Sequence, residues 1–146
     1  MNASVDYQGK KEFVKMGSYG VGVSRLVGAI IEAKYDDKNE IMKWPISVSP
    51  YDCAIIPLIS KNNQANLEKA INVSEHLKKY KIEFIIDDTD ENISSKIKKF
   101  NLIGIPFQII IGNKNEGDNF EFKEILEESK NLPIEEIVKI INKSKK

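Results

Sequence analysis

The side chains with the clearest chemical potential lie in a glycine-rich stretch near the N-terminus. Gly17, Gly20 and Gly22 fall within six residues and are followed by Arg25, the one arginine among 22 basic residues. Glycine lets a base or ribose approach the backbone closely, and a guanidinium can stack on a purine or bind phosphate oxygens through paired donors. The stretch therefore fits a nucleotide site, and equally a tightly packed strand–helix corner with a surface arginine.

Three familiar phosphate-binding patterns do not fit this stretch. The dinucleotide fingerprint needs a third glycine where Arg25 stands. The Walker pattern needs Gly-Lys followed by serine or threonine, which the sequence lacks. A kinase glycine loop needs a large C-terminal lobe, for which 146 residues leave no room. What remains is a strand, a glycine turn and a helix with arginine in its first turn.

Hydrophobic patterning predicts the elements that would hold this stretch in place. Residues 11–17 are predicted as a strand without an obvious partner, 17–22 as a turn and about 23–35 as a helix. The helix is apolar around most of its circumference, so it needs protein on nearly all sides. We therefore expect the chain to be the tail end of a larger protein, or its N-terminal part to pack on something outside it.

The sequence after Pro50 alternates between strand and helix patterns. Residues 36–50, polar and with two prolines, are predicted as a linker, so the predicted domains are 1–35, 36–50 and 51–146. Because the strand runs are apolar throughout, we predict an α/β domain with a mixed five-stranded sheet and helices on both faces. The predicted strands are 52–59, 82–88, 106–112, 119–125 and a short one near Ser129; the predicted helices are 63–80, 93–102 and 133–143.

Several single residues are assigned structural roles. Cys53 and Phe107 begin apolar strands and are predicted to be core, although Phe107 could also offer a stacking face. Trp44 is predicted to pack the linker onto one of the two parts, and His76 to lie on an exposed helix flank. The buried stripe of helix 63–80 is predicted as Leu67, Ala70, Ile71, Ser74 and Leu77, and that of the last helix as Ile134, Ile137, Val138 and Ile141.

The composition excludes several classes of function. Twenty-two acidic residues balance 22 basic ones, so nucleic acid can be held only by a local patch, and we expect neither DNA nor a membrane as a partner. There is no apolar run near 18 residues, and the single cysteine cannot form an internal disulfide, so we expect a cytoplasmic location. No histidine or cysteine lies near the acidic residues 87–91, and no metal site is expected.

Four ordered blocks of sequence carry a family resemblance. The block "MGSYGVGVSRLVGAIIE" resembles motif 3 of class II aminoacyl-tRNA synthetases, specifically the bacterial-type prolyl enzymes. The blocks "WPISVSPYDCAIIPL", "IEFIIDDTDE" and "LIGIPFQIIIG" follow in order and resemble the linker, second strand and third strand of that family's anticodon-binding domain. The resemblance extends from about Val5 to Ile141.

The resemblance implies roles for the glycine-rich stretch. Arg25 would grip ATP, with Gly20 and Gly22 forming the floor beside the nucleotide, while Ser18 and Gly17 would lie near the amino-acid pocket. The implied reaction forms prolyl-adenylate from proline and ATP with Mg²⁺, then transfers proline to its tRNA, in a homodimeric enzyme. Motifs 1 and 2 are absent from this sequence, so no complete catalytic set is expected. The 146 residues alone are expected to be inactive and to bind no cofactor.

The resemblance also implies an anticodon-reading segment, "DDTDENISSK", which follows the second predicted strand. Single-stranded bases are read by hydrogen bonds to their edges and by stacking. Glu91 would accept from guanine N1–H and N2–H₂, Asn92 would bond a base, and Lys96 would meet a phosphate, with Asp88 beside them. The family usually carries arginine at Thr89 and Asn92 and Pro-Gly at residues 93–94. The alternative role for the acidic residues is a solvated loop that caps the next helix.

Two other functions remain open at this point. The chain could be a free-standing, synthetase-like module that binds RNA or a protein without catalysis. It could also be a small flavodoxin-like domain that binds a ligand with the loops at its strand ends. Saturable tRNA binding that weakens with salt would disfavour the flavodoxin-like alternative.

Overall fold

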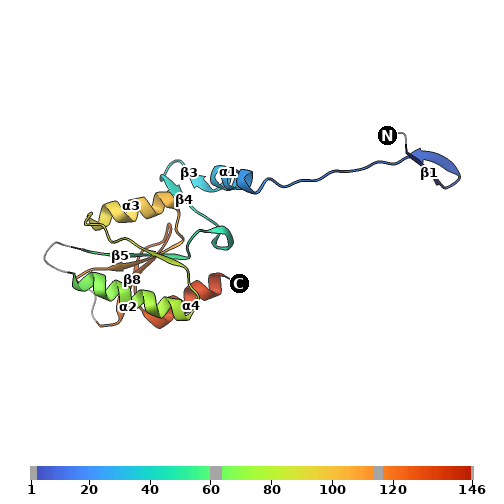
Figure 1. The fold of residues 1–146 in the computed structure, drawn as a ribbon. Coiled ribbons are helices and arrows are strands. Elements are labelled where there is room, and N and C mark those ends of the chain that lie inside the picture. The colour runs from blue at the N-terminus through green and yellow to red at the C-terminus, as the bar shows by residue number, and fades with distance from the viewer. Residues whose placement is uncertain (1–2, 60–63, 114–116, 146) are drawn as a thin grey trace.

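The chain is built on one five-stranded mixed sheet, and an N-terminal hairpin stands apart from it (Figure 1). The computed structural model describes residues 3–59, 64–113 and 117–145. The elements are β1 (Ser4–Tyr7), β2 (Lys10–Phe13), α1 (Val23–Lys34), β3 (Tyr35–Asp36), β4 (Ile41–Met42), a 3₁₀ turn (Ile46–Val48), β5 (Cys53–Pro57), α2 (Ala65–Lys79), β6 (Phe84–Ile86), α3 (Ile93–Ile103), β7 (Phe107–Ile111), β8 (Asn119–Glu124), β9 (Lys130–Pro133) and α4 (Ile134–Ser144).

The strand order of the sheet is β6-β5-β7-β8-β9. The strands β6, β5 and β7 are parallel, whereas β8 runs antiparallel to β7 and β9 antiparallel to β8. The predicted mixed sheet of five strands is thereby confirmed. A flavodoxin-like sheet is excluded, because its strands are parallel throughout whereas β8 runs antiparallel to β7.

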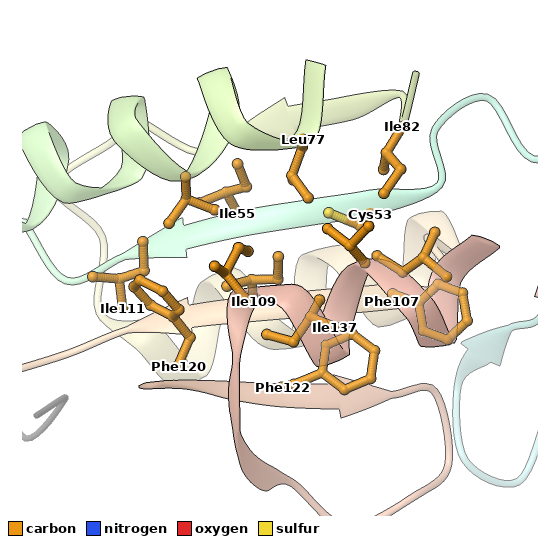
Figure 2. Close-up of a cluster of buried hydrophobic side chains, with 14 of the residues drawn as sticks. Cys53, Ile55, Leu77, Ile82, Phe107, Ile109, Ile111, Phe120, Phe122 and Ile137 are labelled. Carbon is orange, nitrogen blue, oxygen red and sulfur yellow. The ribbon is translucent and has the colours of Figure 1, made fainter. Parts of the chain in front are cut away.

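Two hydrophobic cores lie on opposite faces of the sheet, because successive residues of a strand point to opposite sides. Cys53 and Ile55 of β5 join α2 and α4 in the larger core, part of which Figure 2 shows. Ala54 and Ile56 join α3 in the smaller one. Since β5 and β7 are buried on both faces, their apolar runs are explained.

The structure confirms three of the single-residue predictions. Cys53 and Phe107 are buried, and the Phe107 ring stacks on Phe122 with a centroid separation of 5.5 Å. Burial raises the pKa of the Cys53 thiol, with the neighbouring Asp52 charge adding to the effect, so this cysteine is a core residue and not a nucleophile. The predicted stripe of α4 is buried in full: Ile134, Ile137, Val138 and Ile141.

The predicted buried stripe of α2 is correct at Ala70, Ser74 and Leu77 and wrong at Ile71, while Leu67 is half-buried. Ile71 is 47% exposed, whereas Asn66 and Val73 are buried in its place. Asn66 is drawn inward because its Nδ2 donates to the Leu58 carbonyl at 2.9 Å and to Asn113 Oδ1 at 3.0 Å. His76 is half-buried, not exposed, and its ring lies 5.4 Å from that of Tyr80.

The predicted N-terminal strand differs from the structure in extent and in pairing. Strand β2 ends at Phe13 and has a partner, since Ser4–Tyr7 pairs with it antiparallel. Gln8 and Gly9 connect them with φ of 51° and 77°, the two positive values of a type I′ hairpin turn, which the sequence analysis overlooked. Residues 14–22 form neither the predicted strand end nor a regular turn.

Helix α1 is not enclosed by the described part of the chain. It contains no buried residue, and Leu26, Val27 and Ile31 are 46%, 49% and 42% exposed. An apolar helix face of this size is stable in water only when something covers it. That this part packs on a body outside the 146 residues stays a prediction.

The predicted linker contains short elements and packs against α3. Strands β3 and β4 pair as a small hairpin, and the Trp44 Nε1–H donates to the Ile103 carbonyl at 2.9 Å. Met42 is 3% exposed and lies against Gly104, the left-handed residue that ends α3 with φ of 88°. Trp44 therefore packs the linker onto the C-terminal domain, which is one of the two parts of the chain that were predicted as its partner.

Substitution of Gly104 tests this junction. A Cβ at residue 104 would lie 2.7 Å from the Met42 carbonyl oxygen and 2.7 Å from the Trp44 ring, on a backbone that disfavours side chains. We expect Gly104→Ala to lower the free energy of unfolding by about 2–4 kcal/mol, measured by urea denaturation. Gly28→Ala is the matched control, since nothing lies within 4 Å of its Cβ, and it should cause no loss. Equal stability of both variants would contradict the packing.

Candidate nucleic-acid interface

The acidic segment after β6 divides into a buried anchor and an exposed loop. Asp87 is 5% exposed and directly follows the last residue of β6. Residues 88–92, which we call the 88–92 loop, are all exposed and lead into α3. The sheet thus presents this loop at the carboxyl end of a parallel strand, where α/β domains commonly bind their ligands.

Asp87 is held by two lysines of α3 and by the loop itself. Its Oδ2 is 2.7 Å from Lys99 Nζ and its Oδ1 is 3.6 Å from Lys96 Nζ. Oδ1 also accepts from the backbone N–H of Thr89 at 3.1 Å and from the Thr89 hydroxyl. Burial pushes the pKa of Asp87 upward, but the hydrogen bonds from Lys99 and Thr89 and the charge of Lys96 outweigh it and lower the pKa to about 2.

The predicted phosphate contact of Lys96 is not available in this structure, because the side chain is fully buried at 0% exposure. Its ammonium donates to the Pro57 carbonyl at 3.0 Å and to the Asp87 carbonyl at 3.1 Å. The family resemblance implied this contact, and lysines usually lie at the surface. The correction is that Lys96 belongs to the interior of the domain.

Asn92 is exposed, but its side chain already makes a hydrogen bond within the domain. It is the N-cap of α3, and its Oδ1 accepts from the backbone N–H of Ser95 at 2.8 Å. The capping role proposed as an alternative for the acidic residues therefore falls to the asparagine that follows them. Its side-chain oxygen is engaged, which weakens the assignment of Asn92 as a base-reading residue.

Glu91 and Asp88 remain exposed, as a base-reading role requires. The Glu91 side chain is 50% exposed, and its Oε2 lies 3.4 Å from Lys99 Nζ. An ion pair this exposed contributes little to stability. The carboxylate can therefore exchange the lysine for a base edge at small cost.

A cleft of about 580 Å³ opens between α3 and the sheet, and we call it the α3 cleft. Ile93 and Ile97 of α3 form an apolar wall, while Glu121 of β8 and Asn131 of β9 contribute polar groups. Its remaining lining residues are Leu58, Ile110, Gly112, Asn113, Ser129 and Lys130. An apolar wall that faces hydrogen-bonding groups suits a nucleobase, whose face is apolar and whose edge is polar.

Glu121 and Asn131 were not predicted from the sequence as site residues, although a signal for Glu121 was present. Phe120 and Phe122 are buried in the larger core. Alternation along β8 therefore directs Glu121 to the opposite face, beneath α3. For Asn131 no such signal exists, because the edge strand β9 has only four residues and none of them is buried.

The residues predicted around ATP lie in the exposed N-terminal segment. Ser18, Gly17 and Gly20 belong to the irregular residues 14–22, and Gly22 is the N-cap of α1 with φ of −82°. Arg25 stands in the first turn of that helix, as predicted, and its backbone N–H donates to the Gly22 carbonyl. A Cβ at Gly20 would meet nothing within 4 Å, so the described contacts supply no reason for a glycine there.

A family model described as an anticodon-binding domain matches residues 52–144. The chain belongs to this anticodon-binding family. The match begins one residue before β5 and includes the 88–92 loop and every residue that lines the α3 cleft.

Three relatives that resemble the chain are named proline–tRNA ligase. It is 60% identical over 146 residues to a proline–tRNA ligase of Pelagibacter ubique (strain HTCC1062), an alignment that covers 99% of this chain and 33% of that protein. It is 44% identical over 138 residues to the proline–tRNA ligase of Rickettsia bellii (strain OSU 85-389), an alignment that covers 94% of this chain and 31% of that protein. It is 36% identical over 126 residues to the proline–tRNA ligase of Trichlorobacter lovleyi (strain ATCC BAA-1151 / DSM 17278 / SZ), an alignment that covers 85% of this chain and 22% of that protein. The chain thus spans a third or less of the length of these relatives.

Two features are absent from the described residues. Among residues 3–59, 64–113 and 117–145, no helix has the length and apolar character needed to cross a membrane. Within the same ranges, no group of three or more histidine, cysteine, aspartate and glutamate side chains is arranged to hold a metal ion.

The depressed pKa of Asp87 predicts a pH dependence of stability. Its folded value of about 2 lies below the ordinary 3.8, so the unfolded chain binds more protons between these values. The stability from Asp87, about 2 kcal/mol, is present above pH 4 and is lost as pH falls toward 2. Urea unfolding at a series of pH values should show a shallower fall for Asp87→Asn than for the wild type, with Asp88→Asn as the exposed control. Parallel curves for wild type and Asp87→Asn would contradict the assignment.

Proposed function

We propose that the chain is the C-terminal part of a proline–tRNA ligase and that residues 51–146 bind the anticodon loop of proline tRNA. One observation carries the proposal: the alignment with the Pelagibacter ubique proline–tRNA ligase covers 99% of the chain at 60% identity. The glycine-rich stretch and the anticodon-binding domain therefore match the same enzyme in one continuous alignment. A free-standing module does not explain why the N-terminal segment matches as well.

Anticodon reading is assigned to the 88–92 loop and the α3 cleft. Glu91 and Asp88 are exposed, and a carboxylate is the natural acceptor for the N1–H and N2–H₂ of guanine. Ile93 is the second residue after Glu91 and lines the cleft, so the loop lies at its mouth. A base splayed into the cleft would meet Ile97 with its face and Glu121 with its edge. Lys99 and Lys130 offer cations close to this site for phosphates.

The N-terminal part is assigned to the ATP site of the intact enzyme. Arg25 would contact ATP beside Gly20 and Gly22, while Ser18 and Gly17 would lie near proline. Mg²⁺ would enter with ATP. The uncovered apolar face of α1 supports a catalytic body outside these 146 residues. We place the intact enzyme in the cytoplasm as a homodimer that forms prolyl-adenylate and transfers proline to tRNA.

Glu91→Ala tests the anticodon assignment. The full 146-residue chain should bind an RNA hairpin with the proline anticodon loop saturably in a fluorescence anisotropy titration. Loss of the carboxylate should weaken binding by about 1–3 kcal/mol and should reduce the preference over a hairpin in which the anticodon guanines are replaced.

The matched control for Glu91→Ala is Glu75→Ala, which removes an exposed carboxylate from α2, a helix on the other face of the sheet. It should bind as the wild type does. If Glu91→Ala binds normally while the guanine substitutions still abolish binding, the reading surface lies elsewhere.

Arg25→Ala tests the N-terminal assignment in the intact enzyme. Because the guanidinium would stabilise charge on the reacting phosphate, proline-dependent pyrophosphate exchange should fall by about 100-fold or more, with tRNA affinity retained. Lys34→Ala, at the other end of α1, removes an exposed cation as a control and should leave exchange intact. Exchange at the wild-type rate in Arg25→Ala would refute the role.

A further inference from the structure

We propose that Lys96 is a positioning residue for anticodon reading: its buried ammonium joins the ends of β5 and β6 and thereby sets the conformation of the 88–92 loop. The inference rests on the proposed function, because it concerns the same site. It replaces the phosphate contact that the family resemblance implied for Lys96. It also separates two ways in which a lysine can serve RNA binding, by touching the RNA or by holding the residues that touch it.

The contacts of Lys96 lie where the two parallel strands end. Its Nζ is 3.0 Å from the carbonyl of Pro57, the last residue of β5, and 3.1 Å from the carbonyl of Asp87, which follows β6. It is also 3.6 Å from the Asp87 carboxylate. An ammonium has three donors, and these three oxygens surround it. A buried charge with such partners can be removed only by leaving buried oxygens unsatisfied.

A chain of contacts leads from this buried ammonium to the exposed carboxylate of Glu91. Asp87 Oδ1 accepts from the backbone N–H and the hydroxyl of Thr89, which lies inside the 88–92 loop. Asp87 Oδ2 is 2.7 Å from Lys99 Nζ, and that nitrogen is 3.4 Å from Glu91 Oε2. Lys96 thus positions Asp87, and Asp87 positions the backbone and the cation beside Glu91.

The sequence neighbours of these buried groups line the α3 cleft. Leu58 follows Pro57, and Ile97 follows Lys96, and both contribute to the cleft wall. The spacing between the end of β5 and α3, which Lys96 bridges, therefore also sets the width of the cleft. One buried ammonium would hold both parts of the proposed reading site.

The burial of Lys96 gives a salt-dependence test. A lysine that neutralises an RNA phosphate releases counterions, so its loss lowers the slope of log K against log salt concentration by about 0.7–1. A lysine with no exposed surface makes no such contribution. We therefore expect Lys96→Met to keep the wild-type salt slope. Its preference for the proline anticodon hairpin over the guanine-substituted hairpin should fall by about tenfold, as expected when a coupled network is broken.

The titrations use the full 146-residue chain, with folding of each variant checked by circular dichroism. Lys98→Met is the matched control, because Lys98 is exposed on the same helix, and it should keep the wild-type preference. Thr89→Val removes the hydroxyl contact with Asp87 without changing charge or burial, and should reduce the preference by about threefold with an unchanged slope. This variant decides the question if Lys96→Met does not fold.

Three results would overturn the inference. The first is a salt slope that falls by about one in Lys96→Met, which would mean direct phosphate contact. The second is an unchanged anticodon preference in folded Lys96→Met, or in Thr89→Val if Lys96→Met does not fold. Either result would mean that Lys96 only stabilises the domain and does not position the reading site. The third is an equal loss in Lys98→Met, which would assign the effect to net charge. A wild-type chain that shows no preference between the two hairpins would instead contradict the proposed function itself.

Discussion

The ammonium of Lys96 is the interaction on which the organisation of the site depends. Parallel strands end with backbone carbonyls that have no partner in the sheet, and here two of them converge on one buried cation. Hydrogen bonds from Lys99 and Thr89, together with the charge of Lys96, outweigh the desolvation of Asp87 and keep that carboxyl ionised. Without these partners, Asp87 could not stay buried as an ion, and the segment after β6 would have no buried anchor. The exposed acids that follow it would then lose their defined position.

The rest of the domain surrounds this point with two cores of different size. The larger core packs α2 and α4 on one face of the sheet, whereas the smaller core packs α3 alone on the other. Because one helix does not cover five strands, the face of β7, β8 and β9 beside α3 stays open as the α3 cleft. The imbalance between the cores therefore produces both a stable scaffold and a concave surface beside the 88–92 loop.

The N-terminal segment is packed differently from the sheet domain. The small hairpin of β3 and β4 is anchored on α3 through Trp44 and Gly104, yet α1 just before it exposes its apolar residues. A helix with such a surface is not stabilised by the described part of its own chain. The whole chain aligns with 33% of the length of the Pelagibacter ubique proline–tRNA ligase, and contacts of α1 with protein outside the 146 residues stay a prediction.

Sequence alone was not sufficient for the hairpins β1–β2 and β3–β4, but it was sufficient for the order of elements from β5 onward, the mixed sheet, the stripe of α4 and the core positions of Cys53 and Phe107. These follow from local periodicity and apolar runs, which depend on near neighbours in the chain. The burial of Lys96, the capping role of Asn92, the inward turn of Asn66 and the participation of Glu121 and Asn131 were decided only by tertiary structure. Each depends on a partner from another element or on the end of a strand or helix. The residue type of a lysine does not show whether its side chain is exposed or buried. A lysine can be buried only where the fold brings oxygen acceptors around its ammonium.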